Sequence, residues 1–100
     1  MNQFFDEMGV RWVAAAERRS ATIEAPSLDS RVALELLELA RVSAHTHERR
    51  FAPLSCFMAG VAAERLRAAK GALDDAAVAA YILEVRKELE TETPAAPSER

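Results

Sequence analysis

A chain of 100 residues is long enough for one domain with a single hydrophobic core. Half of its residues are hydrophobic, 29 % are charged and only three are glycine, a composition that favours helices. The net charge of -3 comes from 13 basic and 16 acidic residues mixed along the chain, so we expect no nucleic-acid partner, which would need a large basic stripe.

The N-terminal third predicts one helix and a connector. Residues 3–19 place large apolar side chains on one face at helical spacing, and these are expected to close one side of the core. They are Phe4, Phe5, Met8 and Trp12. Gly9, within the same helix, indicates a close contact with another helix. Because Pro26 disfavours a helix just before it, residues 20–28 are predicted to form a connector.

The second predicted helix spans residues 30–48, with Asp29 or Ser30 as its N-cap. Charged residues on its outer side stand three or four positions apart and could pair as Arg31–Glu35, Glu38–Arg41 and Arg41–His45. Its inner side is expected to pack into the core. That side carries Val32, Ala33, Leu36, Leu37, Ala40 and Ala44.

The third predicted helix, residues 53–70, is apolar on every side as far as Glu64. A helix that is hydrophobic all round packs against neighbours all round, so we expect the other helices to cover the segment from Leu54 to Ala63. This uninterrupted apolar run is well short of the roughly 20 residues that a bilayer requires. We therefore expect no membrane partner.

The last predicted helix spans residues 74–90, with Asp74 or Asp75 as its N-cap, and is followed by a segment with two prolines. Gly71 suits the left-handed end of the preceding helix. One face of the last helix carries Val78, Tyr81, Ile82, Val85 and Leu89. The sequence thus predicts an all-α, compact four-helix domain over residues 1–90, organised around the central apolar helix 53–70, and a disordered C-terminal tail at 91–100.

The densest polar cluster lies where the second helix leads into the third. Arginines just before a helix N-terminus could complete a site for a small anion such as phosphate or a nucleotide, because free amides there bind anions. Cations at the end of a helix more often simply complement its dipole. The candidate anion-binding or partner-binding residues are Arg41, His45, Arg49, Arg50 and Ser55.

Few residues could carry catalysis or hold a metal ion. His45 and His47 point about 200° apart on a helix, so they cannot chelate one ion together. Cys56 follows Arg49 and Arg50, which would lower its thiol pKa, although unreactive buried cysteines are common in helical cores. The sequence has neither a phosphate-binding glycine-rich loop nor a zinc-ligand spacing. We expect no enzyme activity, no catalytic residue, no metal and no cofactor.

Two further expectations concern assembly and location. Three apolar residues lie off the expected inner faces and could form a symmetric homodimer interface: Leu34, Val42 and Leu83. The N-terminus lacks the charged start, apolar run and cleavage site of a signal peptide, and one cysteine cannot form an internal disulfide. We expect a cytoplasmic protein.

Residues of the second and third predicted helices carry a resemblance to a known family. They are the run Leu36-Leu37-Glu38-Leu39-Ala40-Arg41, then Ala44-His45, Glu48-Arg49, Ala52-Pro53-Leu54, Phe57 and Gly60 through Ala63, with Trp12 in keeping. The pattern resembles a family of small actinobacterial helical proteins of unknown function, often encoded beside or fused to molybdenum cofactor guanylyltransferases. The resemblance implies an accessory or protein-interaction module with such a guanylyltransferase as its partner. The matching positions are Arg41, His45, Arg49 and Pro53.

Overall fold

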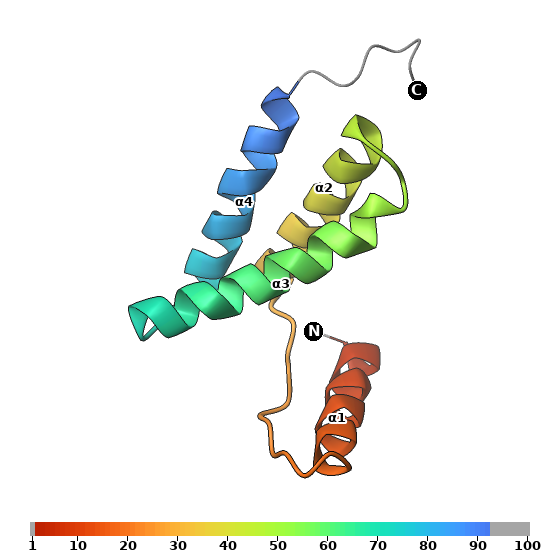
Figure 1. Cartoon of the computed structure of the whole chain (residues 1–100), viewed down its shortest axis with the longest axis vertical. Coiled ribbons are helices and arrows are strands. Elements are labelled where there is room, and N and C mark those ends of the chain that lie inside the picture. The colour runs from red at the N-terminus through yellow and green to blue at the C-terminus, as the bar shows by residue number, and fades with distance from the viewer. Residues whose placement is uncertain (1, 93–100) are drawn as a thin grey trace. The chain divides into compact units, whose positions relative to one another are not determined.

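The computed structural model describes residues 2–92 and contains four helices (Figure 1). They are α1 (Gln3–Glu17), α2 (Ser30–Thr46), α3 (Phe51–Lys70) and α4 (Asp75–Thr91). No β-strand occurs in the described residues, and the predicted all-α fold with four helices is confirmed. Residues 93–100 of the predicted tail lie outside the described residues, and the domain extent 1–90 stays a prediction.

The chain divides into two compact units, with the boundary between Ser30 and Arg31. The first unit contains α1 and the connector, and the second contains nearly all of α2 together with α3 and α4.

In the first unit, α1 begins at Asn2, whose Oδ1 accepts a hydrogen bond from the Phe5 amide at 3.3 Å. Gly9 is buried, and a Cβ added to it would lie 2.7 Å from the carbonyl oxygen of Pro26. Only glycine therefore lets the connector approach α1 this closely. The close contact predicted at Gly9 exists, but the neighbour is the connector backbone and not another helix.

The aromatic residues of α1 form no core within the described residues of the first unit. Phe4 and Trp12 are exposed, and the Phe4 ring meets the Phe5 ring edge-on with centroids 5.0 Å apart. The connector reaches α1 closely at Gly9, where no side chain intervenes, and this contact leaves the aromatic rings uncovered.

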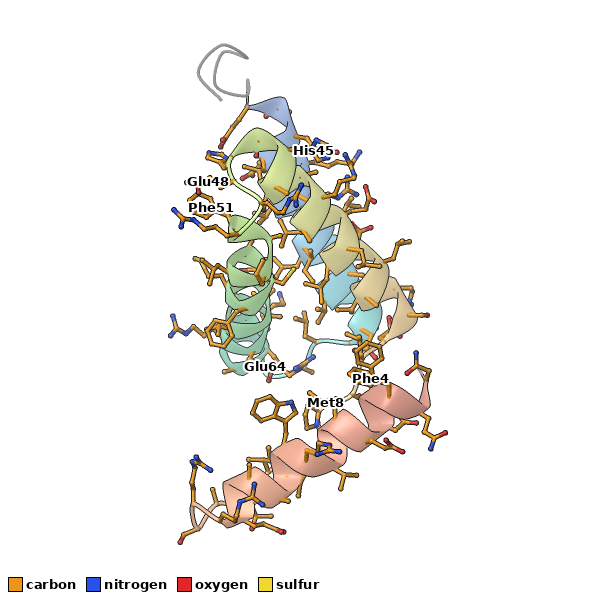
Figure 2. All side chains as sticks on the ribbon, turned by 90° about the vertical axis from the view of Figure 1, so that its right-hand side faces the viewer. Phe4, Met8, His45, Glu48, Phe51 and Glu64 are labelled. Carbon is orange, nitrogen blue, oxygen red and sulfur yellow. The ribbon has the colours of Figure 1, made fainter. Side chains whose placement is uncertain are left out.

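In the second unit, α2 and α4 lie side by side and α3 packs across them (Figures 1 and 2). Arg86 of α4 donates to the carboxylate of Glu35 on α2 at 3.0 Å, and both side chains are largely buried. A second ion pair, between Arg41 and Glu90 at 3.5 Å, joins the same two helices. These pairs fix α4 alongside α2.

Two contacts attach α3 to α2. The Ser43 hydroxyl donates to the Ser55 hydroxyl with 3.0 Å between the oxygens. About two turns of α2 earlier, the carbonyl oxygen of Leu36 accepts from the Cys56 thiol, with Sγ at 3.5 Å. The inner side of α3 is therefore the side that carries Ser55 and Cys56.

The core of the second unit combines Leu39 of α2, Ala63 of α3, and Val78 and Ile82 of α4. The prediction for the inner side of α2 is wrong at Leu37, which is exposed, whereas Leu39 is buried. Apolar residues surround most of the circumference of α2, so their spacing alone did not identify the buried side.

The predicted homodimer interface also needs correction. Val42 is buried in the unit and cannot contact a second copy, and Leu83 is half-buried on α4. Leu34 is exposed as expected. The errors at Val42 and Leu37 have the same origin. The predicted inner side of α2 is rotated about the helix axis relative to the side that is buried.

Within the second unit, α2 and α4 do not cover α3 on all sides. Leu54, Phe57 and Met58 are exposed, while Ala63 is buried and Ala59 is half-buried. Because α2 and α4 lie on the same side of α3, small residues fill that side and the large apolar residues of the opposite side have no neighbour within the unit.

The local signals at the ends of α3 and α4 are confirmed. Gly71 follows α3 in a left-handed conformation with φ 87°, and Asp74 accepts a hydrogen bond from the Ala77 amide at 2.9 Å as the N-cap of α4. α3 begins at Phe51, two residues before the predicted start. Pro53 still falls in the first turn, where its missing N–H removes no helical hydrogen bond.

Candidate functional site

Three large apolar side chains form an exposed surface on α3. Leu54 stands three residues before Phe57 and four before Met58, so the three residues share one face of the helix. Phe57 is 72 % exposed and Met58 is 71 % exposed. We call these three residues the α3 face. Contiguous exposed apolar side chains of this kind mark interaction sites on proteins.

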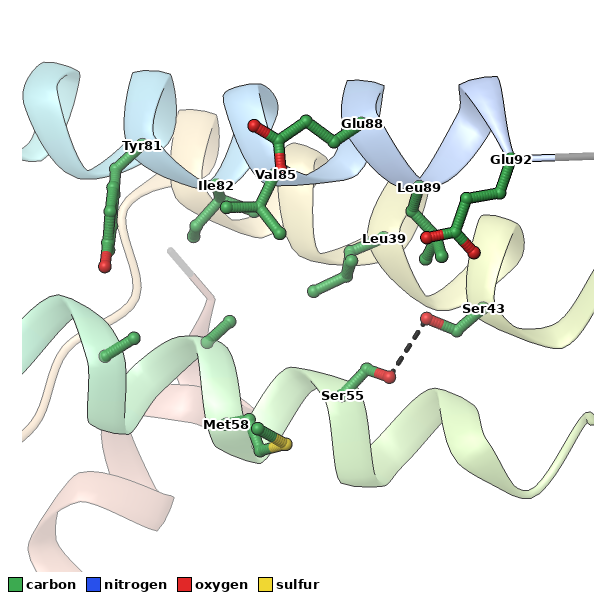
Figure 3. Close-up of a pocket in the computed structure, with 12 residues that line it drawn as sticks. Leu39, Ser43, Ser55, Met58, Tyr81, Ile82, Val85, Glu88, Leu89 and Glu92 are labelled. Carbon is green, nitrogen blue, oxygen red and sulfur yellow. Dashed lines mark hydrogen bonds between the residues drawn. The ribbon is translucent and has the colours of Figure 1, made fainter. Parts of the chain in front are cut away.

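A groove of about 330 Å³ opens between α3 and α4, beside the α3 face (Figure 3). Leu39 of α2 contributes to its floor, and Met58 belongs to both the groove and the α3 face. The apolar and aromatic side chains that line it are Leu39, Met58, Ala59, Ala62, Tyr81, Ile82, Val85 and Leu89. We call this cavity the α3–α4 groove. Its size and apolar walls suit a large hydrophobic side chain.

The α3–α4 groove also contains a few polar groups. The hydrogen-bonded hydroxyls of Ser43 and Ser55 lie at one end (Figure 3). The hydrogen bond between the two hydroxyls holds α2 against α3 at this end of the groove and uses the Ser43 donor. Glu88 and Glu92 extend from α4 along the same groove.

At the corner between α2 and α3, predicted to bind an anion, the first two amides of α3 already have backbone partners. The Phe51 amide donates to the Glu48 carbonyl oxygen at 3.0 Å, and the Ala52 amide donates to the Arg49 carbonyl oxygen at 3.1 Å. Pro53, the third residue of α3, has no N–H. Two of the amides on which the anion hypothesis depends, those of Phe51 and Ala52, are therefore already used, and Pro53 has none.

Two of the predicted anion-binding side chains lie at this corner and face solvent. Arg49 is exposed, and Arg50 forms an exposed ion pair with Glu48 in which Nε lies 2.8 Å from Oε1. Figure 2 shows Glu48 and Phe51 at the link between the two helices, with His45 on the last turn of α2.

The other predicted site residues have partners elsewhere. Arg41 pairs with Glu38 at 2.9 Å as predicted, and it also reaches Glu90 on α4. The Arg41 guanidinium lowers the pKa of the Glu38 carboxyl through this hydrogen bond, and the carboxylate in turn raises the pKa of Arg41. Ser55 faces Ser43 on the inner side of α3. The five predicted residues, His45 included, do not converge on one site.

The environment of Cys56 does not activate its thiol. Burial raises the pKa of Cys56, whereas the sequence predicted that Arg49 and Arg50 would lower it. The thiol also donates to the Leu36 carbonyl oxygen. Both the burial and this hydrogen bond favour the neutral thiol over the thiolate. This thiol has the properties of a packed structural side chain and lacks those of a nucleophile.

The described part of the chain contains neither a candidate metal site nor a candidate membrane-spanning helix. Within residues 2–92, no three His, Cys, Asp or Glu side chains come together in a way that could hold a metal ion. In the same part of the chain, no helix has both the length and the apolar character needed to cross a membrane.

Sequence reasoning missed both the α3 face and the α3–α4 groove. It assigned Leu54, Phe57 and Met58 to a fully covered helix, and it assigned Glu92 to the tail, although this residue is the C-cap of α4. One signal could have found them: α3 carries apolar residues on more sides than two neighbouring helices can cover.

Comparison with known proteins gives one family match. The family described as Domain of unknown function (DUF6457) matches residues 6–97, a range that includes most of α1 and all of α2, α3 and α4. Neither the curated proteins nor the solved structures contain a match to the chain.

Proposed function

The chain belongs to the family Domain of unknown function (DUF6457), and we propose that it is a protein-interaction module without catalytic activity of its own. The observation that carries this proposal is the α3 face, where Leu54, Phe57 and Met58 stand together and exposed on one side of a helix. A partner that covers this face would remove the largest side chains of α3 from water.

The α3 face is large enough to matter energetically. Full burial of a leucine, phenylalanine or methionine side chain contributes about 1.5–3 kcal/mol, which is the scale of the residues that dominate protein interfaces. The helix also supplies a rigid frame, so these side chains need no backbone ordering when a partner binds. The α3–α4 groove beside the face adds a concave surface next to Met58.

The non-catalytic part of the proposal is supported by Cys56. It is the one thiol of the chain, burial raises its pKa, and its hydrogen bond to Leu36 holds it against α2. A nucleophilic cysteine needs the opposite environment, with a lowered pKa and access to a substrate.

As the specific partner we propose a molybdenum cofactor guanylyltransferase of the same organism, acting with this protein in the cytoplasm. The support for this partner is the resemblance carried by residues 36–63, which span most of α2 and the first part of α3. The α3 face falls within that segment.

The test is retention of the purified guanylyltransferase on the immobilised full chain. Leu54→Asp places a charge on the α3 face, and Leu34→Asp makes the same change on α2. The two leucines are matched, because Leu54 is 61 % exposed and Leu34 is 60 % exposed. Neither substitution should unfold the protein, and far-UV circular dichroism checks this.

We expect the wild type and Leu34→Asp to retain the guanylyltransferase and Leu54→Asp to lose at least about ten-fold in affinity, since a charge would replace a buried leucine. Equal retention by Leu54→Asp would show that the α3 face is not the binding surface. No retention by the wild type would remove the guanylyltransferase as partner.

A further inference from the structure

The α3–α4 groove has mostly apolar walls and a rim of one charge. Apart from the hydroxyls of Ser43 and Ser55 at one end, its walls are apolar and aromatic side chains, and the charged residues among the described residues that line it are Glu88 and Glu92. Both are exposed, Glu88 within α4 and Glu92 at its C-cap, and the two stand four positions apart, so about 6 Å along the helix axis separates them. An apolar depression thus lies beside two carboxylates at a fixed spacing.

Neither carboxylate has an ion-pair partner within residues 2–92. Glu90, between them in sequence, differs because it pairs with Arg86 at 3.1 Å and with Arg41 at 3.5 Å. The arginines near α4 are therefore committed to the α2–α4 contact. The negative charge of Glu88 and Glu92 stays available to a partner.

We propose that the α3–α4 groove binds a basic amphipathic helix of a partner protein. A large apolar side chain of that helix enters the groove between Met58 and Val85, and Lys or Arg residues one turn apart lie against Glu88 and Glu92. This inference rests on the proposed function, because it specifies the chemistry of the partner that the α3 face contacts.

The charge of the site favours a basic occupant over an acidic one. An acidic segment would bring like charges against Glu88 and Glu92, and a basic segment brings opposite charges. The chain as a whole has a net charge of -3, which also favours encounter with a cationic partner. Long Lys and Arg side chains suit the rim in a second way, because their methylene stems can cover apolar surface while their charged ends stay in water.

A defined peptide tests the proposal. The probe is a fluorescein-labelled helical peptide of about 18 residues, or five turns, with a stripe of leucines and two lysines one turn apart beside that stripe. A second peptide has glutamate at the two lysine positions and the same leucine stripe. Binding of each to the full chain is measured by fluorescence anisotropy at about 50 mM and about 500 mM salt, where screening differs strongly.

Two double variants of the protein separate local from overall charge. Glu88→Gln with Glu92→Gln removes the charges of the groove, and Glu84→Gln with Glu24→Gln removes the same net charge from exposed residues that do not line it. Val85→Ser changes one apolar wall and leaves both carboxylates in place.

The wild type should bind the lysine peptide about ten-fold more tightly than the glutamate peptide at low salt, and high salt should remove most of that difference. The groove double variant should weaken binding of the lysine peptide about five-fold, a plausible sum for two exposed ion pairs, and the control double variant should leave it unchanged. Val85→Ser should weaken binding of both peptides. Equal affinity for the two peptides, or equal loss in the two double variants, overturns the proposal.

The proposal and the proposed function can fail separately. If the guanylyltransferase binds through Leu54 and the lysine peptide does not recognise Glu88 and Glu92, the basic-helix inference is wrong and the α3 face remains the binding surface. If the lysine peptide binds as expected and the guanylyltransferase is not retained, the partner is wrong and the groove stands. Light scattering of the unliganded chain adds one outcome, because a dimer that Val85→Ser dissociates would show that a second copy occupies the groove.

Discussion

The side of α2 that faces the core can be tested by comparing Leu39→Ala with Leu37→Ala. The two residues have the same side chain and stand two positions apart on one helix, yet Leu39 is 6 % exposed and Leu37 is 69 % exposed. Leu39 packs with Ala63, Val78 and Ile82. Only its truncation should therefore remove core contacts.

The cost of Leu39→Ala follows from its position. Leucine-to-alanine changes in protein cores cost about 2.7–5.0 kcal/mol, with the smaller values where little sealed cavity remains. Leu39 lines the open α3–α4 groove, so its removal enlarges a space that solvent can enter and does not create a sealed void. We expect a loss of about 3 kcal/mol for Leu39→Ala. Leu37→Ala should stay within about 0.5 kcal/mol, because the side chain is mostly in water and alanine favours helix.

Urea denaturation followed by far-UV circular dichroism measures both effects. With a slope near 1 kcal/mol per molar urea, typical of a small unit, Leu39→Ala should lower the midpoint by about 3 M and Leu37→Ala should barely move it. If Leu37→Ala and Leu39→Ala lowered the free energy of unfolding equally, the conclusion that Leu39 faces the core and Leu37 faces solvent would be refuted. A smaller cost for Leu39 than for Leu37 would support the side that the sequence predicted.

Three further predictions concern other contacts. Glu35→Gln should lower the free energy of unfolding by about 1–2 kcal/mol in urea denaturation, because it weakens the hydrogen bond with Arg86, which keeps its ion pair with Glu90. An unchanged free energy of unfolding would show that the Glu35–Arg86 pair does not join α2 to α4. Cys56 should react with a maleimide about ten-fold or more slowly in the native chain than in urea at neutral pH, since burial raises its pKa, and equal rates would contradict that burial. Gly9→Ala should shift the amide resonances around Pro26 while α1 stays helical, because the added Cβ would lie 2.7 Å from the Pro26 carbonyl oxygen, and an unchanged spectrum there would contradict this contact.

The sequence predicted the helices well because their ends are marked by local chemistry. Gly71 ends α3 through a backbone conformation that other residues rarely adopt, and Asp74 begins α4 through a hydrogen bond within one turn. On α4 most of the large apolar residues occupy one face, and two of those named from the sequence, Val78 and Ile82, are buried. Such signals depend only on residues that are close together in the sequence, so they can be recognised from the sequence alone.

The packing of α2 could not be predicted from the same kind of signal. Leu34, Leu37, Leu39 and Val42 point in different directions around one helix, so no single side is distinguished by its apolar character. The side is selected by α4, through the ion pair of Glu35 with Arg86, whose positions are 51 residues apart. A charged residue on a predicted outer face gives no indication that it will be paired and largely buried.

The candidate site escaped prediction for a related reason. A helix that is apolar all round implies neighbours all round, and that inference holds only if every neighbour belongs to the same unit. Leu54, Phe57 and Met58 have none within the second unit, while the polar corner that attracted attention uses its amides in backbone hydrogen bonds. Polar residues near a helix end are conspicuous in a sequence, but their bonding partners are not.

The exposed leucines and aromatic side chains contribute little to the fold, and this makes their role separable from stability. A unit of about 60 residues buries only about 60 % of its unfolded surface, and the core here is already formed by Leu39, Ala63, Val78 and Ile82. Leu54→Asp should therefore leave the free energy of unfolding within about 0.5 kcal/mol of the wild type, as exposed substitutions generally do. If the same variant fails to retain a partner that the wild type retains, the apolar character of the α3 face serves binding. If it unfolds the chain instead, the α3 face is part of the folded core.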